Sequence, residues 1–152
     1  MGMYEYATEY EKLARAVIEV LPELAFIDES DIRVGFLKCF REKKRGKLQR
    51  VLGECCKVED MYQVFAPYDF LIVIYEPNVA ALSENQLKIL LWHELKHIGV
   101  DEKNGTLQYI TVPHDVEEFD SIIYRVGLRW STPGAQVPDI LAGLSGGDPG
   151  GE

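Results

Sequence analysis

A strand followed by a helix in the middle of the chain most constrains the fold. Residues 68–75 (Tyr-Asp-Phe-Leu-Ile-Val-Ile-Tyr) are rich in β-branched and aromatic residues and lie between two prolines, which predicts a strand. A helix is predicted next, because the Ser83 side chain can accept from the backbone of Gln86 while the Gln86 side chain reaches back. Leucines recur through this helix at helical spacing, and Gly99 is typical of a helix end.

The remaining elements follow from shorter patterns. A capping box of Thr8 and Glu11 would begin a first helix. We expect that helix over residues 6–21, strands over 31–40, 50–58 and 107–112, and a last helix from 113 to about 127. The order α-β-β-β-α-β-α predicts an α+β domain with a small, mainly antiparallel or mixed sheet.

Composition fits one domain with a tail. The 152 residues are 47% hydrophobic and 27% charged, which is typical of a soluble globular chain. Residues 132–152 are rich in glycine and proline, so we expect a domain over 1–131 and a disordered tail over 132–152.

Net charge hides one basic stretch. The chain carries a formal charge of −9, which as a whole repels nucleic acid and anionic membranes. Residues 41–50 nevertheless hold six basic residues and one acid, with Gly46 as a candidate hairpin tip. Such a stretch is typically a solvated loop, and contact with a substrate or with nucleic acid is the alternative.

The cysteines and the terminal sequence predict the compartment. Cys39, Cys55 and Cys56 are odd in number and lack CxxC spacing, so we expect free or buried thiols in a reducing compartment. No signal-like or membrane-spanning run is found, and a cytoplasmic protein is expected.

A metal-binding pattern lies within the capped helix. His93 and His97 in His-Glu-Leu-Lys-His are four residues apart, so both imidazoles can reach one metal ion from the same helix face. Zinc suits two imidazoles plus one further ligand and an open position for water. Glu94 can take a proton from zinc-bound water as it attacks a carbonyl, which predicts amide hydrolysis.

The third ligand is expected from the segment after the helix. His114 is the only other histidine, and we expect it at the start of the last helix. Glu117 and Glu118 are rival ligands about one turn further along. Asp115 and Glu118 can instead orient the ligating histidines or interact with the helix dipole.

Other residues around the motif carry weaker signals. Tyr109 and Tyr124 are candidates for stabilising an oxyanion, with nothing to choose between them among eight tyrosines. Trp92 and the neighbouring leucines are expected to pack in the core. The strand over 70–75 is expected to border the cleft.

Two segments, His93-Glu-Leu-Lys-His97 and Pro113-His-Asp-Val-Glu-Glu-Phe119, resemble the phage metallopeptidase family. The resemblance extends over most of residues 4–130, and a more distant one is to SprT-like zinc peptidases. It implies a compact zincin-like fold, with zinc on His93, His97 and His114 and with Glu94 as general base.

These patterns together predict a small zinc-dependent peptidase of phage or prophage origin that acts on a protein or peptide in the host cytoplasm. Two alternatives remain open. The first is a non-catalytic zinc-binding interaction module, in which a fourth protein ligand would close the site. The second is a DNA-associated SprT-like protease that docks through residues 41–50.

Overall fold

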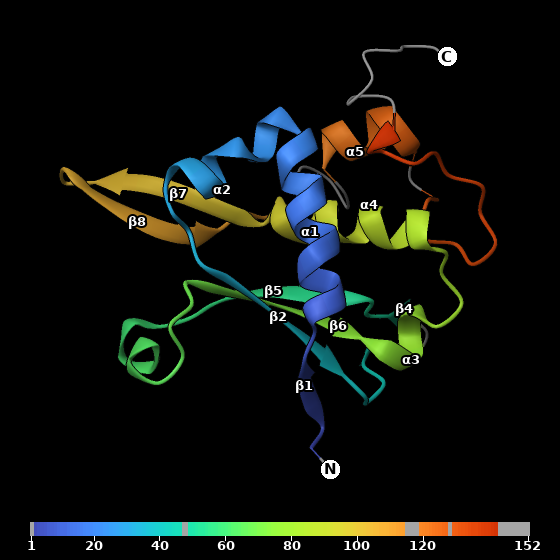
Figure 1. Cartoon of the computed structure of the whole chain (residues 1–152), viewed down its shortest axis with the longest axis horizontal. Coiled ribbons are helices and arrows are strands. Elements are labelled where there is room, and N and C mark those ends of the chain that lie inside the picture. Colours follow the sequence, from blue (N-terminus) through green and yellow to red (C-terminus); the bar gives the residue numbers. More distant parts are fainter. Residues whose placement is uncertain (1, 47–48, 115–118, 128, 143–152) are drawn as a thin grey trace.

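A mixed four-stranded sheet underlies the helices of the domain (Figure 1). The computed structural model describes residues 2–46, 49–114, 119–127 and 129–142. The sheet has the order β1-β2-β6-β5, with β2 parallel to β6 and the two outer strands antiparallel to their neighbours. Its strands are β1 (Tyr4–Tyr6), β2 (Val34–Cys39), β5 (Gly53–Lys57) and β6 (Phe70–Tyr75). The predicted α+β class with a small mixed sheet is therefore confirmed.

The central strand β6 is buried on both faces. Phe70, Ile72 and Ile74 point into the main core, as alternation along a strand requires. Val73 and Tyr75 point to the opposite face, where they form a smaller cluster that includes Cys39 and Val51. This double burial explains the nearly continuous apolar run in the sequence.

The described helices and short helical turns are α1 (Thr8–Val20), η1 (Pro22–Leu24), α2 (Ala25–Glu29), η2 (Asp60–Val64), α3 (Glu76–Val79), α4 (Glu84–Leu95) and α5 (Asp120–Val126). Helix α1 buries Tyr10, Ala14, Val17 and Ile18, a spacing that places all four on one helix face. That face packs against α4 and β2.

The start of α1 differs from the expected capping box. The N-cap is Ala7, which makes no side-chain cap hydrogen bond, and its N–H donates to the carbonyl of Phe36 at 2.8 Å. The chain thus enters the helix directly from β1, a three-residue strand that the sequence prediction missed. Thr8 is already inside the helix and cannot act as its cap.

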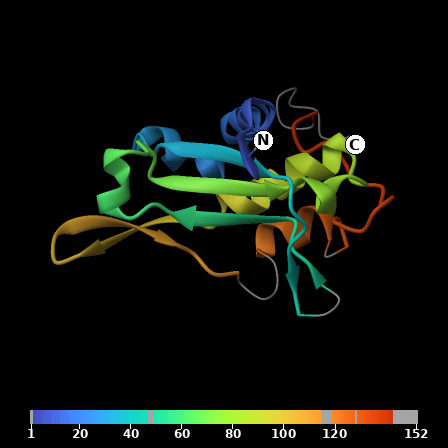
Figure 2. The ribbon, with the colours of Figure 1, turned by 90° about the horizontal axis from the view of Figure 1, so that it is seen from below.

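A long hairpin follows α4 and corrects one expectation. The helix was expected to end at Gly99, but it ends at Leu95, and β7 (Ile98–Lys103) pairs over its whole length with β8 (Thr106–Thr111), which matches the strand expected over 107–112. Asn104 and Gly105, both with positive φ, form the two-residue turn between them. The hairpin lies beyond the edge strand β5 (Figure 2).

A second hairpin confirms the expected tip at Gly46. It consists of β3 (Lys44–Arg45) and β4 (Gln49–Arg50), and Gly46 has a φ of +71°. A positive φ at this turn favours glycine. The hairpin projects from the body of the domain (Figure 2).

The last described residues pack against α4. The Gln86 side chain donates to the carbonyls of Trp130 and Thr132, both at 2.8 Å. Lys88 pairs with Asp139 at 3.0 Å, and Ile140 is fully buried. The segment from 132 to 142 is therefore packed, in contrast to the loose tail expected there, and residues 143–152 lie outside the described residues.

No helix in the described ranges has the length and apolar character needed to cross a membrane.

Candidate metal centre

Helix α4 carries the first two residues of the candidate site on its last turn. Its start has the expected capping box: the Gln86 N–H donates to the Ser83 hydroxyl at 3.2 Å, and the Ser83 N–H donates to the Gln86 side chain at 2.8 Å. Leu90, Leu91 and Trp92 are buried, so the helix is fixed in the core as expected for these residues. His93 and Glu94 are therefore presented by a rigid element.

His97 lies just beyond the end of α4 and is held by the hairpin. Its N–H donates to the carbonyl of Glu94 at 3.1 Å, which tightens the last turn. The Val112 N–H donates to the His97 carbonyl at 2.6 Å, and the His97 Nδ1 lies 2.6 Å from the Val112 carbonyl oxygen. Because a carbonyl only accepts, Nδ1 carries the proton and the lone pair of the ring is on Nε2. This tautomer is the one that a metal ligand bound through Nε2 needs.

His114 completes a cluster with the two motif histidines. Its ring centroid lies 4.7 Å from that of His93 and 4.5 Å from that of His97. The Nε2 atoms of His114 and His93 are 2.9 Å apart, and one nitrogen from each of the three residues lies within 4.8 Å of the others. The structure thus brings together the three histidines that the sequence singled out.

His114 follows β8, and neither it nor Pro113 is helical, which corrects the helix start expected at residue 113. The next described helix is α5, from Asp120. Hairpin β7–β8, which joins His97 to Val112, is therefore what returns His114 to the end of α4. The rival ligands Glu117 and Glu118, and Asp115, lie outside the described residues.

Phe119 and Trp130 support the histidine rings, and the sequence interpretation assigned neither a role. The buried Phe119 ring meets all three imidazoles edge to face, with centroid distances of 5.0–5.6 Å. The Trp130 ring lies 6.1 Å from that of His93. Phe119 belongs to the segment quoted for the family resemblance, but its position under the rings depends on packing between distant segments.

The donor set fits a metal ion that prefers nitrogen ligands. In a tetrahedral site with metal–nitrogen bonds of about 2.0–2.1 Å, two ligand nitrogens lie about 3.3 Å apart. The Nε2 atoms of His93 and His114 are 2.9 Å apart, and all three ligand nitrogens lie within 4.8 Å of one another, a cluster compact enough for one ion. Imidazole donors suit zinc and other borderline transition metals better than magnesium or calcium.

Glu94 lies beside the histidines in a buried position. It is 3% exposed, and its Oε2 is 4.0 Å from the His93 Nε2. A Cβ built on Gly53 of strand β5 would lie 3.4 Å from the same oxygen and 3.1 Å from the backbone oxygen of Val73. Strand β5 therefore lies directly beside the carboxylate, and the tightest contacts of such a Cβ are with Ile74 and Val73 of β6.

A cleft of about 900 Å³ opens in front of these groups. Its walls are the end of α4 and strand β5, with Thr111, Trp130 and the β3–β4 hairpin at its margins. The strand expected to border the cleft, β6, instead lies inside the sheet between β2 and β5. The bordering strand is β5, which pairs on only one side within the described sheet.

Three side chains of β5 have shifted pKa values, and burial raises the pKa of one of them, the Cys56 thiol. Burial raises the pKa of the Cys55 thiol well above its ordinary value, and the Glu94 carboxylate raises it further, so the thiol stays protonated. Burial also acts to raise the pKa of Glu54, but hydrogen bonds from Lys43 and Tyr75 outweigh it and hold that pKa below its ordinary value. The cleft wall therefore carries a neutral thiol beside a paired carboxylate. All three cysteines are free, as expected.

A partly exposed carboxylate ties the end of α4 to its neighbours. Glu23 accepts hydrogen bonds from Lys96 at 2.7 Å, Ser121 at 3.1 Å and Trp92 at 3.3 Å. Burial acts to raise the pKa of Glu23, and these donors together lower it below its ordinary value. One ionised group thus joins η1, α4 and α5 behind the histidines.

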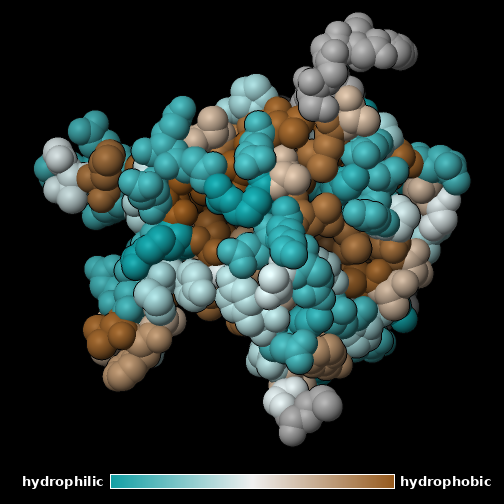
Figure 3. Space-filling view, in the orientation of Figure 1, coloured by the Kyte–Doolittle hydropathy of each residue, from teal (hydrophilic) through white to brown (hydrophobic). Residues whose placement is uncertain are grey.

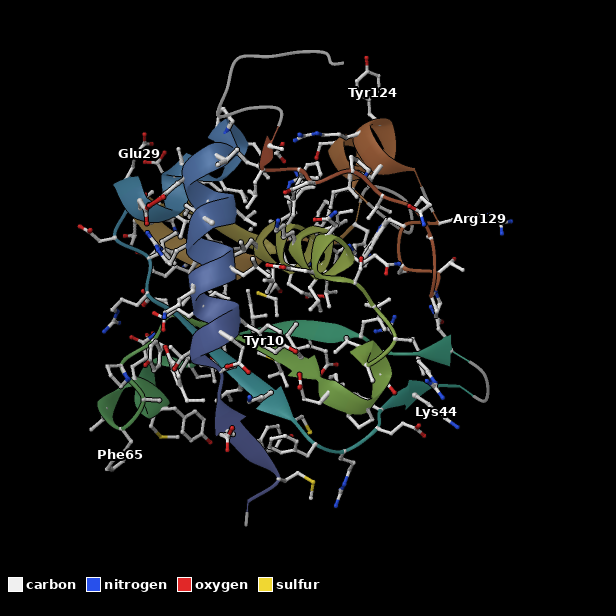
Figure 4. The ribbon with its side chains drawn as sticks, turned by 45° about the vertical axis from the view of Figure 1, so that its right-hand side comes forward. Tyr10, Glu29, Lys44, Phe65, Tyr124 and Arg129 are labelled. Carbon is white, nitrogen blue, oxygen red and sulfur yellow. The ribbon has the colours of Figure 1, made fainter. Side chains whose placement is uncertain are left out.

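Neither tyrosine considered as an oxyanion donor lines the cleft. The Tyr109 ring packs on Phe70, with a centroid distance of 6.0 Å. Tyr124 is 94% exposed and points away from the body of the domain (Figure 4).

A family model described as "Putative phage metallopeptidase" matches residues 2–142. No curated protein and no solved structure matches the chain significantly.

Proposed function

Because the chain belongs to the phage metallopeptidase family, we propose that it is a zinc-dependent peptidase with Glu94 as its general base. One observation carries this proposal: a buried carboxylate stands next to three clustered imidazoles at the wall of an open cleft. Each of these groups has a role in amide hydrolysis, and the cleft gives a substrate access to all of them.

His93, His97 and His114 would hold the zinc ion. When bound, zinc supplies Lewis acidity, which polarises a carbonyl oxygen and lowers the pKa of water. The hydrogen bond from His97 to the Val112 carbonyl fixes that ring with its Nε2 lone pair toward the cluster. Phe119 keeps the three rings apart from bulk water on their inner side.

Glu94 would move the protons. Its carboxylate takes a proton from the attacking water and returns it to the leaving amine. Strand β5 would bind the substrate, because no strand among the described residues pairs with its outer edge, and backbone N–H and C=O groups there can pair with an extended peptide. A protein or peptide is therefore the proposed substrate.

The proposed compartment is the cytoplasm of the host cell of a phage or prophage. Three free thiols, one of them exposed on β5, support a reducing environment.

Metal analysis and one substitution test the site. We expect about one zinc per wild-type chain and a large loss of zinc in His97→Ala. A low zinc content that is the same in both proteins would contradict the ligand assignment.

Activity on a peptide library tests the chemistry. Glu94→Gln should retain zinc but lose about 100- to 10,000-fold in kcat, because the amide cannot accept the proton. Glu102→Gln, an exposed change of the same kind on β7, is the matched control and should behave as the wild type. If Glu94→Gln and the wild type hold zinc equally and neither cleaves any peptide, the non-catalytic zinc-binding module is the correct function.

A further inference from the structure

The β3–β4 hairpin is anchored firmly at one end of the cleft. Asn78 of α3 is 6% exposed, and its amide donates to the carbonyls of Lys43 at 2.8 Å and Val51 at 2.7 Å. These two residues flank the hairpin, and the Val51 N–H donates to the Lys43 carbonyl at 3.0 Å. Lys43 also pairs with Glu54 of β5 at 2.6 Å. The base of the hairpin is therefore fixed relative to the cleft wall.

The strand register sorts the basic side chains of the hairpin. Arg45 lies opposite Gln49, and Lys44 lies opposite Arg50, so each pair shares one face. Lys44 and Arg50 both approach Glu42, at 3.6 and 3.9 Å. Lys44, labelled in Figure 4, lies outside the cleft lining.

Arg45, Gln49 and Arg50 line the cleft that also contains Glu94 and the histidines, and of the two arginines Arg50 already approaches Glu42 at 3.9 Å. Among the described residues, none forms an ion pair with Arg45. A guanidinium offers a planar fork of donors that matches a carboxylate, and the amide of Gln49 beside it can add a further hydrogen bond.

We propose that Arg45, together with Gln49, binds an acidic side chain of the substrate and so selects peptides with Asp or Glu at one position. This inference rests on the proposed function, since it assigns a specificity subsite to the same cleft.

Charge and shape favour a peptide over a nucleic acid. The chain carries a net charge of −9, and the cleft itself contains the carboxylates of Glu54 and Glu94, which repel a continuous polyanion. A single acidic side chain bound at the hairpin end of the cleft experiences less of this repulsion than a continuous polyanion does. The opposite end of β5 leads toward η2 and the β7–β8 tip, where exposed apolar side chains gather on two projections (Figure 3). A ligand along β5 thus meets a cationic end and an apolar end, which suits a mixed peptide sequence.

Peptide selection tests the subsite separately from catalysis. A randomised octapeptide library is passed over immobilised, zinc-loaded Glu94→Gln protein, and the retained peptides are sequenced. We expect Asp and Glu to be enriched at one position. The enrichment should disappear with Arg45→Gln and persist with Lys44→Gln, which removes the same charge from the same hairpin. Arg45→Glu should instead enrich Lys and Arg there.

Binding measurements with the best retained peptide then show how much the acidic side chain contributes to affinity. By fluorescence anisotropy, replacing its selected Glu with Gln should weaken binding about 10- to 100-fold, as for loss of a charge-assisted hydrogen bond. The same loss is expected for Arg45→Gln with the original peptide, and a change within about two-fold for Lys44→Gln.

Each other outcome overturns a distinct claim. No acid enrichment, no retained peptide, or enrichment that survives Arg45→Gln would overturn the subsite. If the wild type cleaves the library without preferring acidic residues, the subsite is overturned and the peptidase proposal stands. If acidic peptides are enriched but the wild type cleaves none of them, the subsite proposal stands and the peptidase proposal is contradicted. If an eight-nucleotide oligothymidylate displaces the labelled peptide at lower concentration than unlabelled acidic peptide does, the hairpin is a nucleic-acid site.

Discussion

The two ends of helix α4 are set by different kinds of interaction. At its start, Ser83 and Gln86 exchange two hydrogen bonds across three residues of sequence. At its end, the chain leaves the helix at Leu95, and His97 pairs with Val112, fifteen residues further along. The capping box at the first end is local, although the Gln86 side chain also donates to the carbonyls of Trp130 and Thr132. The second exists only when the hairpin, α5 and the histidine cluster are in place.

Because of this difference, we expect substitutions at the two ends of α4 to affect stability and function differently. Substitutions at the start of α4 should change the free energy of unfolding without changing the site. Substitutions at the end should change the free energy of unfolding, metal binding and activity together, because the same contacts hold the helix end and the imidazoles.

Phe119→Ala should give the largest loss of stability. It removes a fully packed ring that contacts all three histidines, and such truncations cost about 3–5 kcal/mol. Urea denaturation of the metal-free protein measures the loss. Tyr124→Ala on the same chain segment is the control: its side chain is exposed, and a change within about 0.5 kcal/mol is expected. Equal effects of the two substitutions would contradict a supporting role for Phe119.

Zinc should stabilise the folded chain through the end of α4 alone. At a free zinc concentration of 100 times Kd, the expected gain is about 2.7 kcal/mol. The gain should vanish in His97→Ala and be retained in Ser83→Ala, as measured by denaturation with and without zinc. A gain that persists in His97→Ala would place the bound zinc elsewhere.

Gly99→Ala should disturb the point where the chain passes from helix to hairpin. A Cβ there would lie 2.4 Å from Cγ2 of Val112, so the strands must separate or a side chain must move. Overpacking of this kind costs about 1–3 kcal/mol, and we expect zinc affinity to fall with it. Adding Val112→Ala removes the clashing methyl groups, and a double-mutant cycle should show recovery. Additive losses would rule out the clash as the cause.

The parts of the fold that the sequence predicted correctly are those fixed by neighbouring residues. Strand β6 is visible as a β-branched and aromatic run, and the start of α4 is visible as a capping box. The tip at Gly46 follows from turn chemistry in the same way. Asn104-Gly105 is also a strong local hairpin signal, but the apolar residues through Ile98 have helical spacing and conceal the start of β7.

The rest depends on contacts between distant segments. The motif spacing singled out His93 and His97, but the placement of His114 requires the β7–β8 hairpin, because His114 directly follows that hairpin. That β5, and not β6, borders the cleft follows from the strand order, which periodicity does not contain. Phe119 and Trp130 contact the histidines only through tertiary packing.

Ser83→Ala should give the smallest effect and is the sharpest test of the comparison. Losing the acceptor for the Gln86 N–H costs about 1 kcal/mol, as at other helix N-caps. Ser83→Asp retains an acceptor in the same position and should recover most of that loss. Zinc content and activity per folded molecule should be unchanged in both variants, because the site is fixed at the other end of the helix by Val112, Phe119 and Glu23. A loss of zinc in Ser83→Ala would mean that α4 transmits changes along its length, and that its two ends are not independent.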